Sequence, residues 1–511
     1  MTRQWGAALA ATIGLGALAM ATSAAADPVR VKIDSGVLVG DSKGEVVSFK
    51  GVPYVAAPVG DLRWAPPRPV APWTGERAAT AYGPVCPQTL YANRPNGGGA
   101  MGPAAEDCLF LNVWTARTAH KAPVMVWLHG GANEYGAGSL GVYDGSAFVR
   151  DGVILVSINY RLGILGFFAH PALTKAARPG EPLANYAIMD QIAALRWVRR
   201  NIAAFGGDPD NVTVFGESAG GADTLTLLGT PAAKGLFAKA IVESGGGWSP
   251  PDPLAKAEVA GEALTRKAGA PEAANFAQIR ALSADALIAA GGRFGPIVDG
   301  RLLTESPSQA IGRGHAADVP LMIGSNSYEA SLMKLFGIPP TMMLATVPAN
   351  VKAAYADLPD DTAKASAIFT DAVMGGPARW VATQAQSGQP AYLYHFSYVL
   401  DLQRPTSPGA GHASELPYVF DSWGKLGLNG QGVPVSAADE AITKRVHSCW
   451  SAFAKSGKPA CAGGPDWPAY SSTSDTLMEF DQTPHLEQHF RKAQLDVQEA
   501  RALPTLEIGG K

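Results

Sequence analysis

One strand–turn–helix segment, residues 212–228, constrains the fold of this chain more than any other feature. Val212–Phe215 is a run of β-branched and aromatic residues, which is typical of a buried strand. It leads into the Gly-x-Ser-x-Gly pattern of Gly216–Gly220 and then into an apolar, helix-compatible stretch, Ala222–Leu228. Small residues around Ser218 permit a sharp, strained turn that pushes the hydroxyl out of the sheet, where a base and a substrate can reach it. An ordinary turn between a strand and a helix is the alternative.

Further strands around this segment predict a parallel sheet. Ala122–Leu128 is nearly all apolar, as a strand covered on both faces should be, and Gly152–Tyr160 is also expected to be a buried strand. Tyr186–Phe205 has apolar residues at helical spacing and ends at a Gly-Gly-Asp-Pro stop. A strand, a helix and a strand in this order form a parallel βαβ unit. The later elements expected are strands at Ala238–Gly245, Val319–Gly324 and Ala391–Leu400, an Ala-rich helical stretch at Ala255–Ala290, and a helix at Ala437–Ser456.

A Gly-rich turn, His129-Gly130-Gly131-Ala132-Asn133, directly follows the strand at Ala122–Leu128. Small residues after a buried strand let backbone N–H groups point at a ligand. In an enzyme that transfers acyl groups, such donors bind the oxyanion, and the N–H of Ala219 points toward the same place. A Gly-Gly turn without this role is the alternative.

Histidine is the expected base, because its side chain titrates near neutral pH. Among the nine histidines, His412 stands out, since it follows a strand in a Gly-rich loop C-terminal to the serine. His395 lies within an expected strand and His447 within the last expected helix. His485 and His489 are spaced like a metal pair, but the residues between them match neither known zinc-protease pattern. We therefore expect no metal and no cofactor.

The base requires a carboxylate that holds its tautomer. Glu329 follows an expected strand and lies between Ser218 and His412, and the order Ser, Glu, His is a known chain order for a triad whose serine stands in a Gly-x-Ser-x-Gly turn. From spacing alone, three other acids compete with it: Asp299, Asp318 and Asp401.

The composition narrows the function classes and the location. The chain has 511 residues, 47% of them hydrophobic, and a net charge of −3, which argues against a nucleic-acid partner. Arg3, the apolar run Gly6–Met20 and the small residues Ser23–Ala26 form the pattern of a secretory signal peptide that is cleaved after about Ala26. A retained anchor is the alternative, and no later stretch is expected to span a membrane. We predict a leader at 1–26, one domain at 27–511, and a secreted or periplasmic protein.

Four cysteines fit export to an oxidising compartment. Local pairing, Cys86 with Cys108 and Cys449 with Cys461, is the simplest of three connectivities. Four buried thiols are the alternative.

The chain resembles the type-B carboxylesterases, the family of the cholinesterases and the bacterial para-nitrobenzyl esterases. The resemblance runs over nearly the whole mature chain and is carried by many motifs in order. These are Phe49–Tyr54, Leu62-Arg63-Trp64, Glu106–Val113, Trp127–Gly131, Asn159-Tyr160-Arg161, Asp190-Gln191 through Pro209, Gly216–Gly221, His412–Phe420 and Trp467–Tyr470.

This resemblance implies an α/β-hydrolase fold, with a large, mostly parallel central sheet and helices on both faces. It implies Ser218 as nucleophile, His412 as base and Glu329 as acid, and an oxyanion hole made by the N–H groups of Gly131, Ala132 and Ala219. It also supports the Cys86–Cys108 disulfide, and it places Glu217 and Ser244 near the triad.

Two departures from the family pattern stand out. A third glycine and an aromatic residue often follow His-Gly-Gly in the family, whereas this chain has Ala132 and Asn133, and Asn133 is expected to make the pocket edge more polar. The acid motif usually ends in Glu-Gly, whereas this chain has Glu329-Ala330.

The predicted function is hydrolysis of carboxylic esters through an acyl-enzyme intermediate, with a small-molecule ester as substrate. The same chemistry on an amide, a thioester or a lactone is the alternative, and a catalytically silent binding module is a second one. Trp248 is expected either to line the acyl pocket or to pack in the core. Loops such as Cys86–Cys108 and the one around Ala330 are expected to determine the size, chain length and stereochemistry of the ester.

Overall fold

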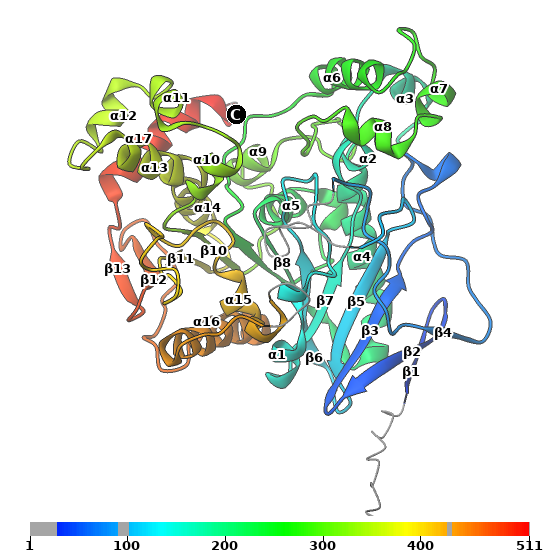
Figure 1. The fold of residues 1–511 in the computed structure, drawn as a ribbon, viewed down its shortest axis with the longest axis horizontal. Coiled ribbons are helices and arrows are strands. Elements are labelled where there is room, and N and C mark those ends of the chain that lie inside the picture. Colours follow the sequence, from blue (N-terminus) through cyan, green and yellow to red (C-terminus); the bar gives the residue numbers. More distant parts are fainter. Residues whose placement is uncertain (1–27, 90–101, 427–431, 510–511) are drawn as a thin grey trace, which may run out of the picture.

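The computed structural model describes residues 28–89, 102–426 and 432–509 (Figure 1). The predicted leader at 1–26 and the middle of the Cys86–Cys108 loop lie outside the described residues. A 13-stranded sheet runs through the described chain. Its strands are β1 (Val29–Ile33), β2 (Gly36–Lys43), β3 (Val46–Pro53), β4 (Glu76–Ala78), β5 (Phe110–Ala116), β6 (Ala122–Leu128), β7 (Ile154–Ile158), β8 (Gly207–Glu217), β9 (Lys239–Glu243), β10 (Leu321–Asn326), β11 (Ala391–Phe396), β12 (Thr476–Phe480) and β13 (His485–Gln488).

Helices connect and cover these strands. They are α1 (Ser146–Arg150), α2 (Gly163–Gly166), α3 (Pro171–Ala176), α4 (Tyr186–Asn201), α5 (Ala219–Leu228), α6 (Leu254–Lys267), α7 (Phe276–Arg280), α8 (Ala284–Ala289), α9 (Pro307–Gly312), α10 (Ser331–Leu335), α11 (Pro340–Ala345), α12 (Ala349–Ala353), α13 (Asp361–Thr370), α14 (Gly376–Ala385), α15 (Leu416–Phe420), α16 (Ala437–Ser456) and α17 (Lys492–Ala502). A π-helix, η5 (Asp371–Gly375), joins α13 to α14. Short 3₁₀ turns are η1 (Gly60–Leu62), η2 (Gly141–Tyr143), η3 (Ile202–Phe205), η4 (Pro231–Ala233), η6 (Trp423–Lys425) and η8 (Leu503–Thr505).

The sheet is parallel in its centre and antiparallel at its edges. The strand order is β1-β2-β3-β5-β7-β6-β8-β9-β10-β11-β12-β13, and β4 pairs with β2. The pairs from β7 through β12 are parallel, whereas the pairs from β1 to β7 along this order and the pair β12–β13 are antiparallel. The predicted large, mostly parallel sheet is therefore confirmed.

Alternation along β6 shows why the sheet needs helices on both faces. Val124, Val126 and Leu128 pack in one hydrophobic cluster with residues of α4 and α5. Met125 and Trp127 point to the other face and pack with residues of α1, α15 and α16. Because successive side chains of a strand point to opposite faces, an all-apolar strand must be covered twice.

Three predicted boundaries were wrong. The stretch Ala255–Ala290 is not one helix but three, α6 to α8, because Gly269-Ala270-Pro271 ends the first helix and Ser283 caps the start of the third. The strand predicted at Ala391–Leu400 ends at Phe396. The strand before Ser218 begins at Gly207, so the last three residues of the Gly-Gly-Asp-Pro stop already belong to β8, whereas Gly206 ends η3.

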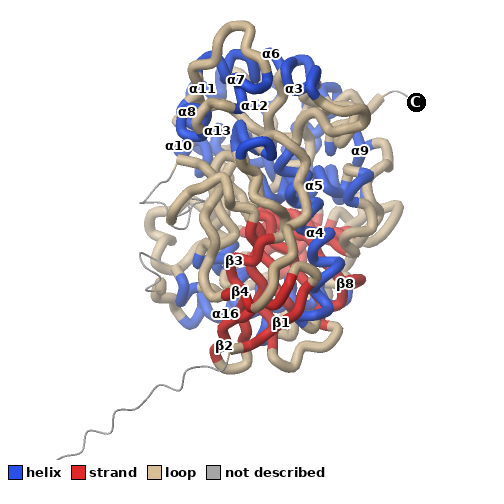
Figure 2. Tube along the Cα trace, turned by 90° about the vertical axis from the view of Figure 1, so that its right-hand side faces the viewer, coloured by secondary structure: helices blue, strands red, loops and turns tan. Residues whose placement is uncertain are grey.

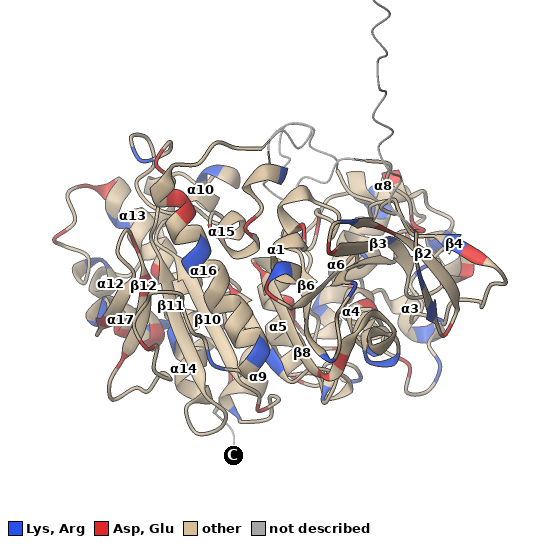
Figure 3. Cartoon of the chain, turned by 90° about the horizontal axis from the view of Figure 1, so that it is seen from below, with Lys and Arg blue, Asp and Glu red and all other residues tan. Residues whose placement is uncertain are grey.

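Two groups of short helices, α6–α8 and α10–α13, lie at the end of the sheet where the parallel strands finish (Figures 1 and 2). Acidic and basic residues are interspersed over the elements seen from below (Figure 3), as the small net charge suggests. Among the described residues, no helix is long and apolar enough to cross a membrane. Both predicted disulfides are present, with Cα atoms 4.9 Å apart in Cys86–Cys108 and 4.4 Å apart in Cys449–Cys461.

Candidate active site

Ser218 lies at the joint between β8 and α5, in the strained turn that the sequence predicts. Its backbone has φ 56° and ψ −123°, a conformation that non-glycine residues rarely adopt. The turn is too tight for side chains, because a Cβ on Gly220 would lie 2.0 Å from the carbonyl oxygen of Leu128. The serine is thus held at the carboxyl end of the sheet, where open α/β sheets bind their ligands.

Two loops on neighbouring strands bring His412 and Glu329 to this serine. Glu329 follows β10, His412 follows β11, and these strands are paired in parallel. His412 Nε2 lies 2.8 Å from Ser218 Oγ, and His412 Nδ1 lies 2.6 Å from Glu329 Oε2. The imidazole thereby connects the serine hydroxyl to a carboxylate, as a general base must be connected.

The fully buried carboxylate of Glu329 is held from its other side. Its Oε1 accepts hydrogen bonds from Ser244 Oγ at 2.5 Å and from the backbone N–H of Asn326 at 2.7 Å. Ser244 directly follows β9 and has a left-handed backbone, φ 46°. Ala330, where the family often has glycine, has φ −63°, so this position needs no glycine.

The three competing acids lie elsewhere and have other partners. Asp299 accepts hydrogen bonds from the backbone N–H groups of residues 301–303 and of Leu183. Asp318 accepts one from the N–H of Gln389, and Asp401 accepts one from Ser436 Oγ. They cap turns and anchor loops, and of the four acids considered from spacing, Glu329 is the one that contacts His412.

The loop after β6 packs directly against the nucleophilic turn. A Cβ on Gly130 would lie 3.0 Å from Ser218 Cβ, and Gly131 has φ 113°. Ala132 and Asn133 both have left-handed backbones, with φ 54° and 59°. Within the described residues, the N–H groups of Gly131, Ala132 and Ala219 have no hydrogen-bond partner, so they are available to an oxyanion.

Asn133 does not make the pocket edge more polar, contrary to expectation. Its side chain is buried, with 4% exposed, and its Nδ2 lies 3.5 Å from Asp223 Oδ1 of α5. The sequence missed this contact because it joins segments far apart along the chain.

Glu217 places a second carboxyl group beside the base. Its Oε1 lies 3.1 Å from His412 Nε2. Burial raises the pKa of Glu217 to about 8. Burial by itself lowers the pKa of His412, but the carboxyls of Glu217 and Glu329 outweigh it and raise that pKa above its ordinary value. Glu217 and Glu329 thus determine together the pH at which His412 loses its proton.

Two further buried glutamates lie behind the triad, and the sequence did not point to them as site residues. Glu243 accepts a hydrogen bond from Trp450 Nε1 at 2.8 Å, and burial raises its pKa well above the ordinary value. Glu415 accepts one from Asn326 Nδ2, and burial raises its pKa to about 7. In the sequence, Glu243 directly precedes Ser244, and Glu415 lies in the motif His412–Phe420 that contributes to the family resemblance.

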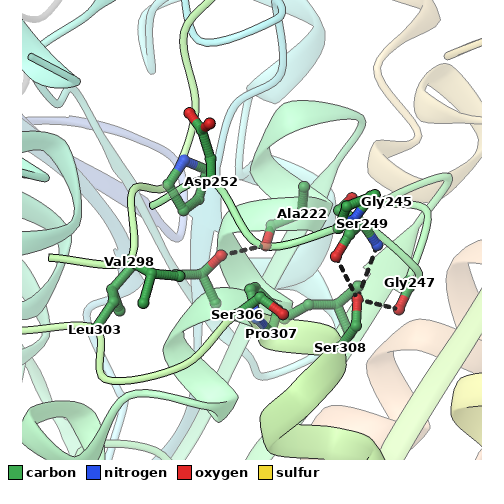
Figure 4. A pocket seen from close by; sticks show the side chains of 14 residues that line it. Ala222, Gly245, Gly247, Ser249, Asp252, Val298, Leu303, Ser306, Pro307 and Ser308 are labelled. Carbon is green, nitrogen blue, oxygen red and sulfur yellow. Dashed lines mark hydrogen bonds between the residues drawn. The ribbon is translucent and has the colours of Figure 1, made fainter. Parts of the chain in front are cut away.

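A cavity of about 80 Å³ adjoins α5 on the side of the segment after β9 (Figure 4). Ser308 Oγ braces its wall, accepting a hydrogen bond from the N–H of Ser249 at 2.8 Å and lying 3.3 Å from the carbonyl oxygen of Gly247. Trp248 is partly buried against the core, and its Nε1 donates to the carbonyl oxygen of Ala372 at 2.8 Å. The hydrogen bond ties Trp248 to η5, and the packing role expected for it is present.

Fold and site together define a hydrolase of the α/β-hydrolase fold that works through an activated serine. Comparisons with known proteins agree. The sequence matches the carboxylesterase family over residues 27–352 and 346–498. The chain therefore belongs to the carboxylesterase family and is a carboxylic ester hydrolase.

Relatives and solved structures resemble the chain over most of its length. It is 33% identical over 505 residues to a fumonisin B1 esterase of Sphingopyxis macrogoltabida, with 92% of this chain and 90% of the relative covered. It is 35% identical over 489 residues to a para-nitrobenzyl esterase of Bacillus subtilis, with 87% and 93% covered. A crystal structure of a carboxylesterase from Geobacillus stearothermophilus superposes with a TM-score of 0.80 at 34% identity, with 91% and 99% covered.

Proposed function

We propose that Ser218 is the nucleophile of this esterase, His412 its general base and Glu329 the acid that orients the base. The observation that carries the proposal is the continuous path of contacts, 2.8 Å from Ser218 Oγ to His412 Nε2 and 2.6 Å from His412 Nδ1 to Glu329 Oε2. Ser218 attacks the ester carbonyl while His412 takes its proton. His412 then protonates the leaving alcohol, and water activated by the same histidine releases the acid.

The N–H groups of Gly131, Ala132 and Ala219 would bind the oxyanion of both tetrahedral intermediates. The positions of these groups support this role. Gly131 and Ala132 lie in the loop packed on Ser218, and Ala219 is the first residue of α5. A helix N-terminus also favours the developing negative charge. Glu217 and Ser244 would support the triad from behind without touching the substrate.

We further propose that residues 1–26 are a cleaved leader, that 27–511 form one domain, and that the protein is exported to the periplasm or beyond. Two disulfides support export, because such bonds persist in oxidising compartments.

The first test is hydrolysis of para-nitrophenyl acetate, butyrate and octanoate by the wild type and by Ser218→Ala. A para-nitrobenzyl ester, a matched thioester and a matched anilide extend the series. We expect ester turnover to fall by about 10⁶-fold in Ser218→Ala, because a triad without its nucleophile retains little activity. Ser456→Ala, an exposed serine at the end of α16, is the matched control and should retain full activity.

The chain-length profile would measure the acyl pocket, and the anilide and thioester would show which related bonds the enzyme also cleaves. Full esterase activity in Ser218→Ala would disprove the assignment of the nucleophile.

A further inference from the structure

A buried polar chain connects the oxyanion loop to the two helices behind it. Asn133 Nδ2 lies 3.5 Å from Asp223 Oδ1, and Asp223 Oδ2 accepts a hydrogen bond from Gln191 Nε2 at 2.6 Å. Asn133 belongs to the loop after β6, Asp223 to α5 and Gln191 to α4. All three side chains are buried, with exposed fractions of 4%, 0% and 0%.

Asp223 is an unusual residue at this place, because its carboxyl group has no cation beside it among the described residues. Its hydrogen-bond partners there are the two side-chain amides. Burial raises its pKa to about 7, since the amide bonds offset only part of the lost hydration. An uncompensated buried carboxyl group is costly, so its presence calls for a role other than stability.

The loop that it contacts carries backbone strain. Ala132 and Asn133 are consecutive non-glycine residues with left-handed backbones, and such residues persist only where their surroundings hold them. Two contacts hold them here: the carbonyl oxygen of Asn133 accepts a hydrogen bond from the N–H of Gly163 at 2.6 Å, and its side chain reaches Asp223. The N–H groups of Gly131 and Ala132 immediately precede this anchored residue.

We propose that Asn133, Asp223 and Gln191 form a tether that positions the oxyanion loop relative to α5. The inference rests on the proposed role of the Gly131, Ala132 and Ala219 N–H groups. Ala219 and Asp223 lie one turn apart on α5. The same rigid helix therefore supplies the N–H donor of Ala219 and, through Asp223, holds Asn133, which directly follows the donors Gly131 and Ala132 in the chain. The three side chains are positioning residues, and none of them touches the substrate.

The test compares Asp223→Ala, Asp223→Asn and Asn133→Ala with the wild type on para-nitrophenyl butyrate. The inhibition constant of an alkyl trifluoromethyl ketone, which mimics the tetrahedral oxyanion, is measured alongside. We expect Asp223→Ala and Asn133→Ala to lower kcat about 10- to 100-fold, less than the roughly 10²- to 10³-fold cost of losing a donor. KM should stay within about threefold, and the inhibition constant should rise by the same factor as kcat/KM falls.

Asp223→Asn should retain activity within about fivefold, because reorientation of the neighbouring amides lets a neutral amide replace the carboxylate. The double variant Asp223→Ala/Asn133→Ala should be no worse than either single variant, since both break one tether. Thr265→Val, a buried position on α6 whose hydroxyl donates to carbonyl oxygens of its own helix, is the control and should match the wild type.

Additive effects of the two alanine variants, or a loss of kcat without weaker ketone binding, would overturn the proposal. If Asp223→Ala does not fold, Asn133→Ala alone decides, because it removes only a loop side chain. A failure of the proposed function would look different from a failure of the tether. If the proposed function were wrong, the ketone would not inhibit the wild type and Ser218→Ala would retain activity.

Discussion

Single residues at the site combine strain with burial. Ser218, Ser244, Ala132 and Asn133 all have left-handed backbones, and Glu329 is completely buried. Each such feature costs stability on its own, and their concentration around one hydroxyl group is typical of a preorganised catalytic site. We therefore expect the environment of the site to affect activity most clearly through the pKa values of its ionisable groups.

The carboxyl group of Glu217 should determine the acidic limb of the pH profile. The base must be neutral to take the serine proton, so kcat/KM rises with pH up to the pKa of His412. Glu217 raises this pKa from 3.1 Å away. We expect Glu217→Gln to lower the pKa and to move the acidic limb to lower pH, measured from kcat/KM between pH 5 and 9.

Glu415→Gln is a suitable comparison, because its carboxyl raises the pKa of His412 less than those of Glu217 and Glu329 do. It should move the limb in the same direction but less far. A limb that moves to higher pH in Glu217→Gln would contradict the assigned electrostatic role.

Local sequence was enough to single out some site residues and not others. Ser218 and His412 stand in Gly-rich turns after strands, and this context is visible along the chain. Glu329 had three rivals by spacing, and only the family resemblance separated it from Asp299, Asp318 and Asp401. Asp223 and Glu243 gave no usable signal, because their contacts cross between elements that are distant in sequence.

At the scale of elements, the spacing of apolar residues predicted the central strands and α4. The main error came from residues that interrupt a helix. Apolar strands such as β6 and β7 are unambiguous because both faces are buried. The stretch at 255–290 was misjudged because high Ala content hides a Gly-Ala-Pro interruption. The last two strands, β12 and β13, were missed, since β12 is short and includes Glu479, and the edge strand β13 is polar and partly exposed.

A buried ion pair anchors α4 to the end of β7. Arg161 contacts Asp190 through Nε at 2.8 Å and through Nη2 at 2.7 Å, and both side chains are almost inaccessible. We expect Arg161→Met to lower the free energy of unfolding by about 3–5 kcal/mol, because it leaves a buried carboxylate without its partner. Urea unfolding monitored by fluorescence measures this loss.

The double variant Arg161→Met/Asp190→Leu should recover much of that loss, because no unpaired charge remains. Burial raises the pKa of Asp190 and Arg161 opposes the rise, so Arg161→Met should be more destabilised at pH 8 than at pH 5. Arg30→Met, which breaks the exposed pair with Glu76, should leave the unfolding free energy nearly unchanged. Equal losses in the single and double variants would argue against this account.

At the scale of the whole molecule, the two disulfides should differ in their effect on activity. Each closes a loop of moderate length, with sequence separations of 22 and 12 residues, so replacing either pair by serine should cost roughly 3 kcal/mol of unfolding free energy. Gln88, two residues after Cys86, makes two hydrogen bonds of 2.8 Å with the backbone of Gly136, beyond the oxyanion loop. We expect Cys86→Ser/Cys108→Ser to lose kcat as well.

Cys449→Ser/Cys461→Ser should lose stability only, because that bridge ties the loop after α16 to the helix, and buried apolar residues such as Val446, Trp450 and Phe453 still hold α16 on the sheet. Urea unfolding and para-nitrophenyl butyrate turnover, measured on both variants without reductant, separate the two outcomes. A fall in kcat that is equal in both variants would show that the Gln88 contact has no special influence on the site.

The distance along the chain between the reacting groups also determines when activity can arise during folding. Ser218 and His412 are 194 residues apart, and β10 and β11 must pair before His412 can meet the serine. A refolding chain can complete its N-terminal half, with the nucleophile and the Gly-rich loop in place, and still turn over nothing. The return of ester hydrolysis after dilution from denaturant therefore reports the time at which β11 docks. Fluorescence from the buried tryptophans of the N-terminal half can recover earlier.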